Sequence, residues 1–200
     1  MSHVWDERYA GTDYHFGTNP NNFLVAQSGL LKFGQTCLAI ADGEGRNGVW
    51  LAEQGLQVHS IDSSEVALCK ARRLAQSRGV ALNFEQADLR QWRWPERCYD
   101  VAAAIFIQFV GPVQRVQLFE NIQRCLKPGG LLLLQGYTTR QLEFGSGGPS
   151  QIDNLYTEEV LRIAFSQLEI LSMHLHDDVI HEGVGHNGMS ALIDMVARKH

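Results

Sequence analysis

Short apolar runs alternate with helix-like stretches at a spacing of roughly 20 to 30 residues through most of this chain. The apolar runs predict five strands, at residues 35–41, 57–62, 81–86, 99–109 and 131–136. Strands that alternate with helices form βαβ units, in which helices cover both faces of a parallel sheet. The pattern therefore predicts an α/β fold with three layers.

The pattern changes after the fifth run. Residues 140–156 are polar and rich in glycine, and predict a loop followed by a helix at about 157–165. Two extended stretches follow, at about 168–177 and 189–198, with the polar segment 178–188 between them. We expect these two stretches to pair as an antiparallel hairpin whose turn is residues 178–188.

The composition narrows the class of partner. The formal net charge is −5 and the four cysteines are scattered without a CxxC pair. Nucleic-acid binding usually requires a basic surface, and a membrane span requires ~20 consecutive apolar residues, which this chain lacks. The first residues, MSHVWDERYAG, do not have the pattern of a signal peptide. We expect a cytoplasmic protein that binds neither nucleic acid nor membrane.

A glycine-rich turn, ADGEGRNG at residues 41–48, lies between the first strand and its helix. Glycines let backbone amides approach a ligand, and a parallel sheet binds its ligand beyond the carboxyl ends of its strands. Asp62 ends the second strand, where a carboxylate can accept hydrogen bonds from both hydroxyls of a ribose. An adenosine-containing cofactor is therefore predicted, and NAD, FAD and S-adenosylmethionine all fit. NAD is disfavoured because residues 131–200 lack room for a second nucleotide-binding half.

Several segments together resemble one family. CLAIADGEGRNGVWLAEQGLQVHSIDSS, FEQADLRQW, YDVAAAIFIQF and LKPGGLLLLQGY are similar, in order and spacing, to the motifs of class I S-adenosylmethionine-dependent methyltransferases. WDERY, DYHFGTNPNNFL, GSGGP, LYTEEVL and HEGVGHNGMSALIDMVARK resemble small bacterial members related to tellurite-resistance and thiopurine methyltransferases. The resemblance implies a Rossmann-like three-layer sandwich. Its seven-stranded, mostly parallel sheet has the order 3-2-1-4-5-7-6, with strand 7 antiparallel.

The resemblance also implies a single methyltransferase domain over residues 1–200. Residues 1–34 form an N-terminal helical cap, in which a helix from Asn19-Pro20 to about Leu31 follows an aromatic segment. Residues 35–137 form the cofactor-binding core. Residues 138–200 supply the loop, helix and hairpin on the substrate side. We expect a monomer or a homodimer.

The cofactor implied is S-adenosyl-L-methionine, with S-adenosyl-L-homocysteine as product. The residues expected to bind it are Ala41, Asp42, Gly43, Gly45, Arg46, Asp62, Ser63, Asp88, Leu89 and Ile105. The resemblance implies that Gly43 and Gly45 line the methionine end of the cofactor and that Asp62 holds the ribose. It also implies that Asp88 accepts a hydrogen bond from the adenine amino group and that Ile105 offers backbone atoms near the ammonium group. Arg46, at the start of a helix, is a candidate partner for the methionine carboxylate, the alternative being an exposed charge on the helix face.

The chain departs from the family at two positions. Ala39 stands where an acidic residue is frequent, and Ala41 stands where the turn has its first glycine. The first departure affects how the ammonium is bound and how the turn is braced. Asp42 and Glu44 are neighbouring carboxylates that can compensate.

The implied reaction is in-line transfer of a methyl group to a small-molecule acceptor. Alignment and exclusion of water are then the main contributions of the protein. His186 is the candidate base or substrate ligand, the alternative being a solvated turn histidine. Tyr14 is the second candidate catalytic residue, because an aromatic face over a sulfonium attracts it. The alternative is that Tyr14 and its aromatic neighbours pin the N-terminal helix to the sheet.

Two other functions compete with the enzyme. One is a regulatory module that binds S-adenosylmethionine without catalysis. The other is a metal-binding protein that uses the histidine cluster from His174 to His186, since imidazoles and carboxylates are metal ligands. Strand alternation places Asp177 on the opposite face from His174 and His176. We therefore expect no metal site.

Overall fold

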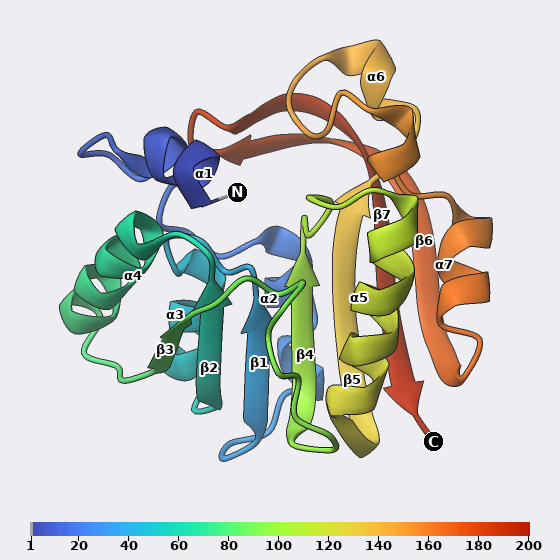
Figure 1. Cartoon of the computed structure of the whole chain (residues 1–200), viewed down its shortest axis with the longest axis horizontal. Helices are drawn as coiled ribbons and strands as arrows, with labels where there is room; N and C mark the ends of the chain where they lie inside the picture. Colours follow the sequence, from blue (N-terminus) through green and yellow to red (C-terminus); the bar gives the residue numbers. More distant parts are fainter. Residues whose placement is uncertain (1) are drawn as a thin grey trace. The chain divides into compact units, whose positions relative to one another are not determined.

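The computed structural model describes residues 2–200, with side chains from Val4 onward. Seven strands are hydrogen-bonded in the order β3-β2-β1-β4-β5-β7-β6 (Figure 1). The pairs β1–β2, β2–β3 and β4–β5 are parallel, whereas β7 runs antiparallel to β5. The predicted strand order and the antiparallel seventh strand are confirmed. The chain divides into two compact units.

The first unit contains the residues up to Arg93 together with Glu182–Gly185. Its elements alternate between helices and strands after an N-terminal helical segment: α1 (Ser2–Tyr9), α2 (Asn22–Ala26), the 3₁₀ helix η1 (Ser28–Leu30), β1 (Thr36–Ile40), α3 (Arg46–Glu53), β2 (Gln57–Asp62), α4 (Glu65–Ser77) and β3 (Asn83–Gln86). Both α3 and α4 pack on β2, and α1 packs on α4.

Local chemistry explains where these elements begin and end. Residues Cys37 to Ile40 are fully buried, as expected for a strand covered on both faces. The Ser64 side chain caps α4 by accepting a hydrogen bond from the Ala67 amide. The helix predicted from Asn19-Pro20 to Leu31 is wrong in extent, because α2 ends at Ala26 and η1 replaces its last turn. Helix α1 was not predicted.

The second unit contains residues Trp94–His181 and His186–His200. Its elements carry the other four strands: β4 (Tyr99–Ile105), α5 (Pro112–Cys125), β5 (Leu126–Tyr137), α6 (Gln141–Phe144), the 3₁₀ helix η2 (Ile152–Asn154), α7 (Glu158–Ala164), β6 (Leu168–Glu182) and β7 (His186–Lys199). Helix α5 packs on β5 and α7, and α6 packs on β7. Leu132, Leu133 and Leu134 of β5 are fully buried at the centre of this unit.

Several predictions for the second unit are wrong. Strand β5 begins at Leu126 rather than at residue 131, and the predicted loop 140–156 contains α6 and η2. Strand β4 ends at Ile105 rather than at residue 109, because Phe106 adopts a left-handed backbone with φ of 55°. The hairpin turn is residues 183–185 rather than 178–188. Strand β6 stands last in the strand order, and an edge strand can keep polar residues extended because one side faces solvent. The polar composition of residues 178–188 therefore indicated a turn where the chain is mostly strand.

Among the described residues, none of the helices has both the length and the apolar character that a membrane span requires. The four cysteines form no disulfide within residues 2–200.

Candidate cofactor site

The turn after β1 is built on left-handed backbone conformations. Ala41, Gly43 and Gly45 have φ of 49°, 58° and 85°. A side chain in this region is strained, which is why glycine is the usual residue there. Ala41 therefore adopts the left-handed backbone with a Cβ atom and bears the strain that this causes.

The turn is also closely surrounded. A Cβ atom on Gly43 would lie 2.8 Å from the Tyr9 hydroxyl oxygen, and one on Gly45 would lie 2.6 Å from the Ala71 Cβ atom. Both positions therefore require glycine. Residue Gly45 also precedes α3 as its N-cap, so the turn leads directly into the start of a helix.

Asp62 joins the turn to the end of β2. One carboxylate oxygen accepts from the Gly43 amide at 2.9 Å and the other from the Ser64 amide at 2.9 Å. Burial raises the pKa of this carboxyl group above its usual value. The Ser63 amide is a third backbone donor to this carboxylate, which offers about four acceptor sites, so acceptor capacity remains for a ribose hydroxyl. This buried acceptor beside a glycine turn fits the ribose of an adenosine.

Asp42 braces the turn from within. Its two carboxylate oxygens accept from the Gly48 amide at 3.0 Å and from the Ser60 hydroxyl at 2.8 Å. Burial raises its pKa from 3.8 to about 7. The side chain thus connects the start of α3 and β2 to the turn. Asp42 therefore braces the turn, although Ala39 stands where the family frequently has an acidic residue.

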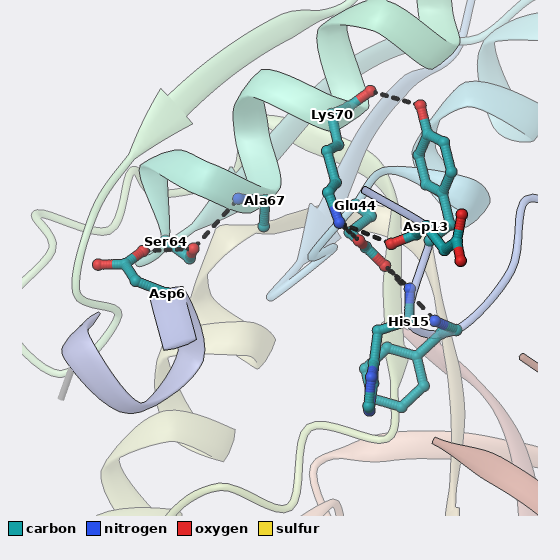
Figure 2. Close-up of polar contacts among 9 residues, drawn as sticks. Asp6, Asp13, His15, Glu44, Ser64, Ala67 and Lys70 are labelled. Carbon is teal, nitrogen blue, oxygen red and sulfur yellow. Dashed lines mark hydrogen bonds and ion pairs between the residues drawn. The ribbon is translucent and has the colours of Figure 1, made fainter. Parts of the chain in front are cut away.

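Glu44 makes a buried ion pair with Lys70 of α4, with 2.7 Å between Glu44 Oε1 and Lys70 Nζ. Figure 2 shows how this pair holds an N-terminal strap, defined as residues 13–16. Lys70 Nζ donates to the Asp13 carbonyl at 2.7 Å, and Glu44 Oε2 accepts from the His15 amide at 2.7 Å. The side chain of Glu44 is 2% exposed and that of Lys70 is 8% exposed. The pair therefore links the turn, α4 and the strap into one buried polar cluster.

Aromatic side chains of the N-terminal segment lie over the turn. The Tyr9 ring contacts His15 and Phe16 edge-on, with ring centroids 6.4 and 6.2 Å apart. Burial, followed by the carboxylates of Asp62 and Glu44, raises the pKa of Tyr9 well above its usual value. The Tyr9 hydroxyl, which faces Gly43, is thus held in its neutral form beside the turn.

The candidate residue Tyr14 is attached to α4. Its hydroxyl donates to the Lys70 carbonyl at 3.1 Å, and its ring packs on the cluster of Val49, Leu74 and Ala75. These contacts attach the strap to α4, whereas the alternative for the aromatic residues was that they pin the N-terminal helix to the sheet. A role of Tyr14 over a sulfonium stays a prediction.

Arg46 is buried, so the alternative of an exposed charge on the helix face is wrong. Its guanidinium pairs with Glu182, with 2.6 Å between Nη2 and Oε2, and Nη1 donates to the Asn19 carbonyl. Glu182 also accepts from the Asn21 side-chain amide at 3.0 Å. A pairing of Arg46 with a cofactor carboxylate stays a prediction, and it would have to compete with Glu182.

The residues after β3 lie beside Asp62. The Ala87 amide donates to the Asp62 carbonyl at 2.9 Å, which places Asp88 and the buried Leu89 next to the end of β2. Asp88 accepts from Arg90 Nε at 2.8 Å, and this hydrogen bond lowers the pKa of Asp88. The Ser63 carbonyl accepts from the Gln86 side chain at 3.2 Å. The predicted adenosine-binding residues thus gather in the first unit.

Two predicted residues belong to the second unit. Ile105 is buried at the end of β4, directly before the left-handed Phe106. His186 is buried at the start of β7, so a solvated turn histidine is wrong. Its ring meets Phe106 at 4.5 Å and Tyr137 at 5.6 Å between centroids, both edge-on.

Sequence reasoning missed Lys70, Phe106 and Tyr137, and it considered Glu182 as a metal ligand rather than as the partner of Arg46. Lys70 carried a signal, since it lies on the same helical face as Ala67, Ala71 and Leu74, where a lysine is buried only if it is paired. The others carried no local signal, because their partners are distant in sequence.

The comparisons with known proteins agree with this geometry. Residues 37–130 match the family model described as Methyltransferase domain. Carboxy-S-adenosyl-L-methionine synthase of Desulfotalea psychrophila is 34% identical over 94 residues, which cover 44% of this chain and 36% of the relative. Phosphoethanolamine N-methyltransferase 2 of Caenorhabditis elegans is 28% identical over 152 residues, 74% of this chain and 33% of the relative. The chain thus spans about a third of the length of these two relatives.

Solved structures share the fold over nearly the whole chain. The first structure has a TM-score of 0.80 at 21% identity, and the match covers 100% of this chain and 91% of the other. It is described by the conversion of a disulfide bond into a thioacetal group during echinomycin biosynthesis. TehB of Haemophilus influenzae has a TM-score of 0.73 at 17% identity, covering 100% and 67%. NodS of Bradyrhizobium japonicum, an N-methyltransferase in complex with S-adenosyl-L-homocysteine, has a TM-score of 0.73 at 15% identity, covering 99% and 97%. Residues 37–130 are therefore similar to a methyltransferase domain, and the chain shares the Rossmann-like fold of the solved S-adenosylmethionine-dependent methyltransferases.

Proposed function

We propose that this protein is an enzyme that transfers a methyl group in line from S-adenosyl-L-methionine to a small-molecule acceptor. The single observation that carries the proposal is the buried Asp62 carboxylate, fixed beside the glycine turn at the end of β2. The matched methyltransferase domain and the net charge of −5, which disfavours a nucleic-acid acceptor, support it. We place the enzyme in the cytoplasm, as a monomer or homodimer.

The residues of the first unit hold the adenosine in this proposal. Asp62 accepts hydrogen bonds from the two ribose hydroxyls, and the backbone of Gly43 and Gly45 lies against the rest of the cofactor. Asp88 accepts from the adenine amino group, with Ser63 and Leu89 beside it. The Asp88 carboxylate exchanges part of its hydrogen bonding to Arg90 for this contact.

Bound S-adenosyl-L-methionine supplies a methyl group on a positively charged sulfur. The chain contributes alignment and exclusion of water. Tyr9 and the strap cover the turn, and the Glu44–Lys70 pair keeps the strap in place. An aromatic covering of this kind also suits a sulfonium, because aromatic faces attract cations.

His186 is the proposed base or acceptor ligand. Its imidazole lies against two aromatic rings, Phe106 and Tyr137, which limit its rotation. A general base is needed only for an acceptor that carries a proton at neutral pH, and it then contributes roughly 10²- to 10⁴-fold to the rate. Turnover of His186→Asn, compared with that of His181→Asn, measures this contribution.

The proposal is tested first by cofactor binding. Titration calorimetry with S-adenosyl-L-homocysteine should give one site per chain, and Asp62→Ala should weaken the affinity roughly tenfold or more because two hydrogen bonds to a charged acceptor are lost. Asp178→Ala is the matched control, since this aspartate is exposed in the other unit. Unchanged affinity in a folded Asp62→Ala protein would remove the assignment of Asp62.

The second test is of turnover. The protein is incubated with labelled S-adenosyl-L-methionine and a small-molecule extract, and the labelled product is identified. Formation of S-adenosyl-L-homocysteine that depends on the extract supports the enzyme. Binding without turnover on any acceptor would replace the enzyme by a regulatory module that binds the cofactor.

A further inference from the structure

Three metal-ligating side chains meet on the last two strands of the sheet order, β7 and β6. His174 and His176 are two residues apart on β6 and therefore share a face. Asp194 of β7 completes the cluster, and one ligand atom from each of the three residues lies within 4.8 Å of the others. The distance from His176 Nε2 to Asp194 Oδ2 is 2.9 Å.

The carboxylate of this cluster is oriented from behind. Gln135 of β5 pairs in register with Asp194, and its side-chain amide donates to Asp194 Oδ1 at 2.6 Å. Gln135 is buried, so this hydrogen bond fixes one carboxylate oxygen and leaves the other beside His176. Hydrogen bonds of this kind from an outer residue orient the ligands in protein metal sites.

The two imidazoles are also arranged together. Their rings stack with centroids 5.0 Å apart and planes inclined by 16°. An ion pair between His176 and Asp194 needs only one imidazole, so it does not account for the second histidine beside it. His174 is exposed and can turn toward a shared ligand without disturbing the interior of the unit.

We propose that His174, His176 and Asp194 bind one divalent transition-metal ion of the Zn²⁺ class. Ligand atoms that bind Zn²⁺ at 2.0–2.1 Å in a tetrahedron lie about 3.3 Å apart. The His176–Asp194 pair reaches this value by opening a few tenths of an ångström, and rotation of His174 brings in the third ligand. Three protein ligands leave a fourth position for water or another small ligand.

This site differs from the one that the sequence analysis rejected. The local carboxylate Asp177 lies one residue after His176, on the other face of β6, and pairs with Arg140. The carboxylate that completes the cluster comes instead from β7, 18 residues after His176. The site is independent of the proposed methyl transfer, because none of its three residues is assigned to the cofactor or to the acceptor.

The test is Zn²⁺ binding to the full chain, without an affinity tag and after treatment with EDTA. Titration calorimetry should give one Zn²⁺ per chain. His176→Ala and Asp194→Asn should each weaken binding at least ~10-fold, and Gln135→Leu by roughly 10- to 100-fold, as for other outer residues of metal sites. His181→Ala should stay within twofold, because this exposed histidine of β6 bonds to Asn187 outside the cluster.

A second measurement guards against misfolded variants. Zn²⁺ should raise the thermal unfolding temperature of the wild type and of His181→Ala, but not that of His174→Ala, whose exposed side chain can be removed without loss of folding. Absence of stoichiometric binding, or equal weakening by His181→Ala, would overturn the proposal. The outcome does not depend on methyl transfer, so failure here leaves the proposed function untouched.

Discussion

Replacing Lys70 by methionine tests the buried polar cluster that holds the strap. Of the described hydrogen-bond donors to Glu44, the change leaves only the backbone amides of the strap. The Glu44 side chain is 2% exposed, so its charge stays buried. Removing one partner of a buried ion pair costs about 3–5 kcal/mol, because the remaining charge is left uncompensated. We expect the free energy of unfolding of Lys70→Met to fall by this amount.

The same helix provides the control. Arg72 pairs with Glu65 at 2.8 Å, nearly the distance of the Lys70–Glu44 pair, but the two side chains are 44% and 49% exposed. Exposed pairs contribute about 0–1 kcal/mol. Arg72→Met should therefore cost less than 1 kcal/mol, and the difference between the two variants measures the effect of burial.

A double-mutant cycle separates the pair from other effects of the substitutions. Glu44→Gln keeps an oxygen for the strap amides while it removes the charge. The double variant Glu44→Gln/Lys70→Met should be more stable than the sum of the single effects predicts, by about 2 kcal/mol. Urea unfolding followed by circular dichroism gives all four free energies. Additive effects, or a cost for Lys70→Met no larger than that for Arg72→Met, would refute this reasoning.

Two further predictions concern the turn. Ala41→Gly should raise the free energy of unfolding by about 0.5–1 kcal/mol, because relief of roughly 1–2 kcal/mol of left-handed strain exceeds the entropy cost of a glycine. Ala52→Gly within α3 should instead lower the free energy of unfolding by about 1 kcal/mol in the same urea assay. A loss of stability in both variants would contradict the backbone strain at Ala41. Asp42, whose pKa is raised from 3.8 to about 7 in the folded protein, should destabilise the fold as pH rises through this range, since the unfolded chain releases the proton first. Compared with Asp42→Asn, the wild type should lose about 2–3 kcal/mol between pH 5 and pH 8, and a constant difference between the two proteins would show that the raised pKa is wrong.

Local features were sufficient to predict much of the first unit. The buried run at β1, the glycines of the turn and the terminal Asp62 of β2 follow one another within 27 residues, so their spacing alone indicated a strand, a turn and an acceptor. Ser64 could be predicted as a cap because capping depends on neighbours three residues away.

The edge of the sheet was harder to predict. Residues 178–188 have the composition of a turn, yet all but three of them extend β6 and β7. Hydrogen bonding to a neighbouring strand decides that conformation, and polarity on an edge strand does not oppose it. The left-handed Phe106, which ends β4, had no signal in its own sequence context.

The sequence by itself determined the order of the strands, the position of the glycine turn and the aspartate beside it, because periodicity and backbone freedom act between residues close in the chain. Only the tertiary structure decided the partners of the buried charges. Glu44 meets Lys70 after 26 residues, Arg46 meets Glu182 after 136, and His176 meets Asp194 from a different strand. Charges removed from water need partners at hydrogen-bond distance, and the fold, rather than the local spacing, brings those partners together.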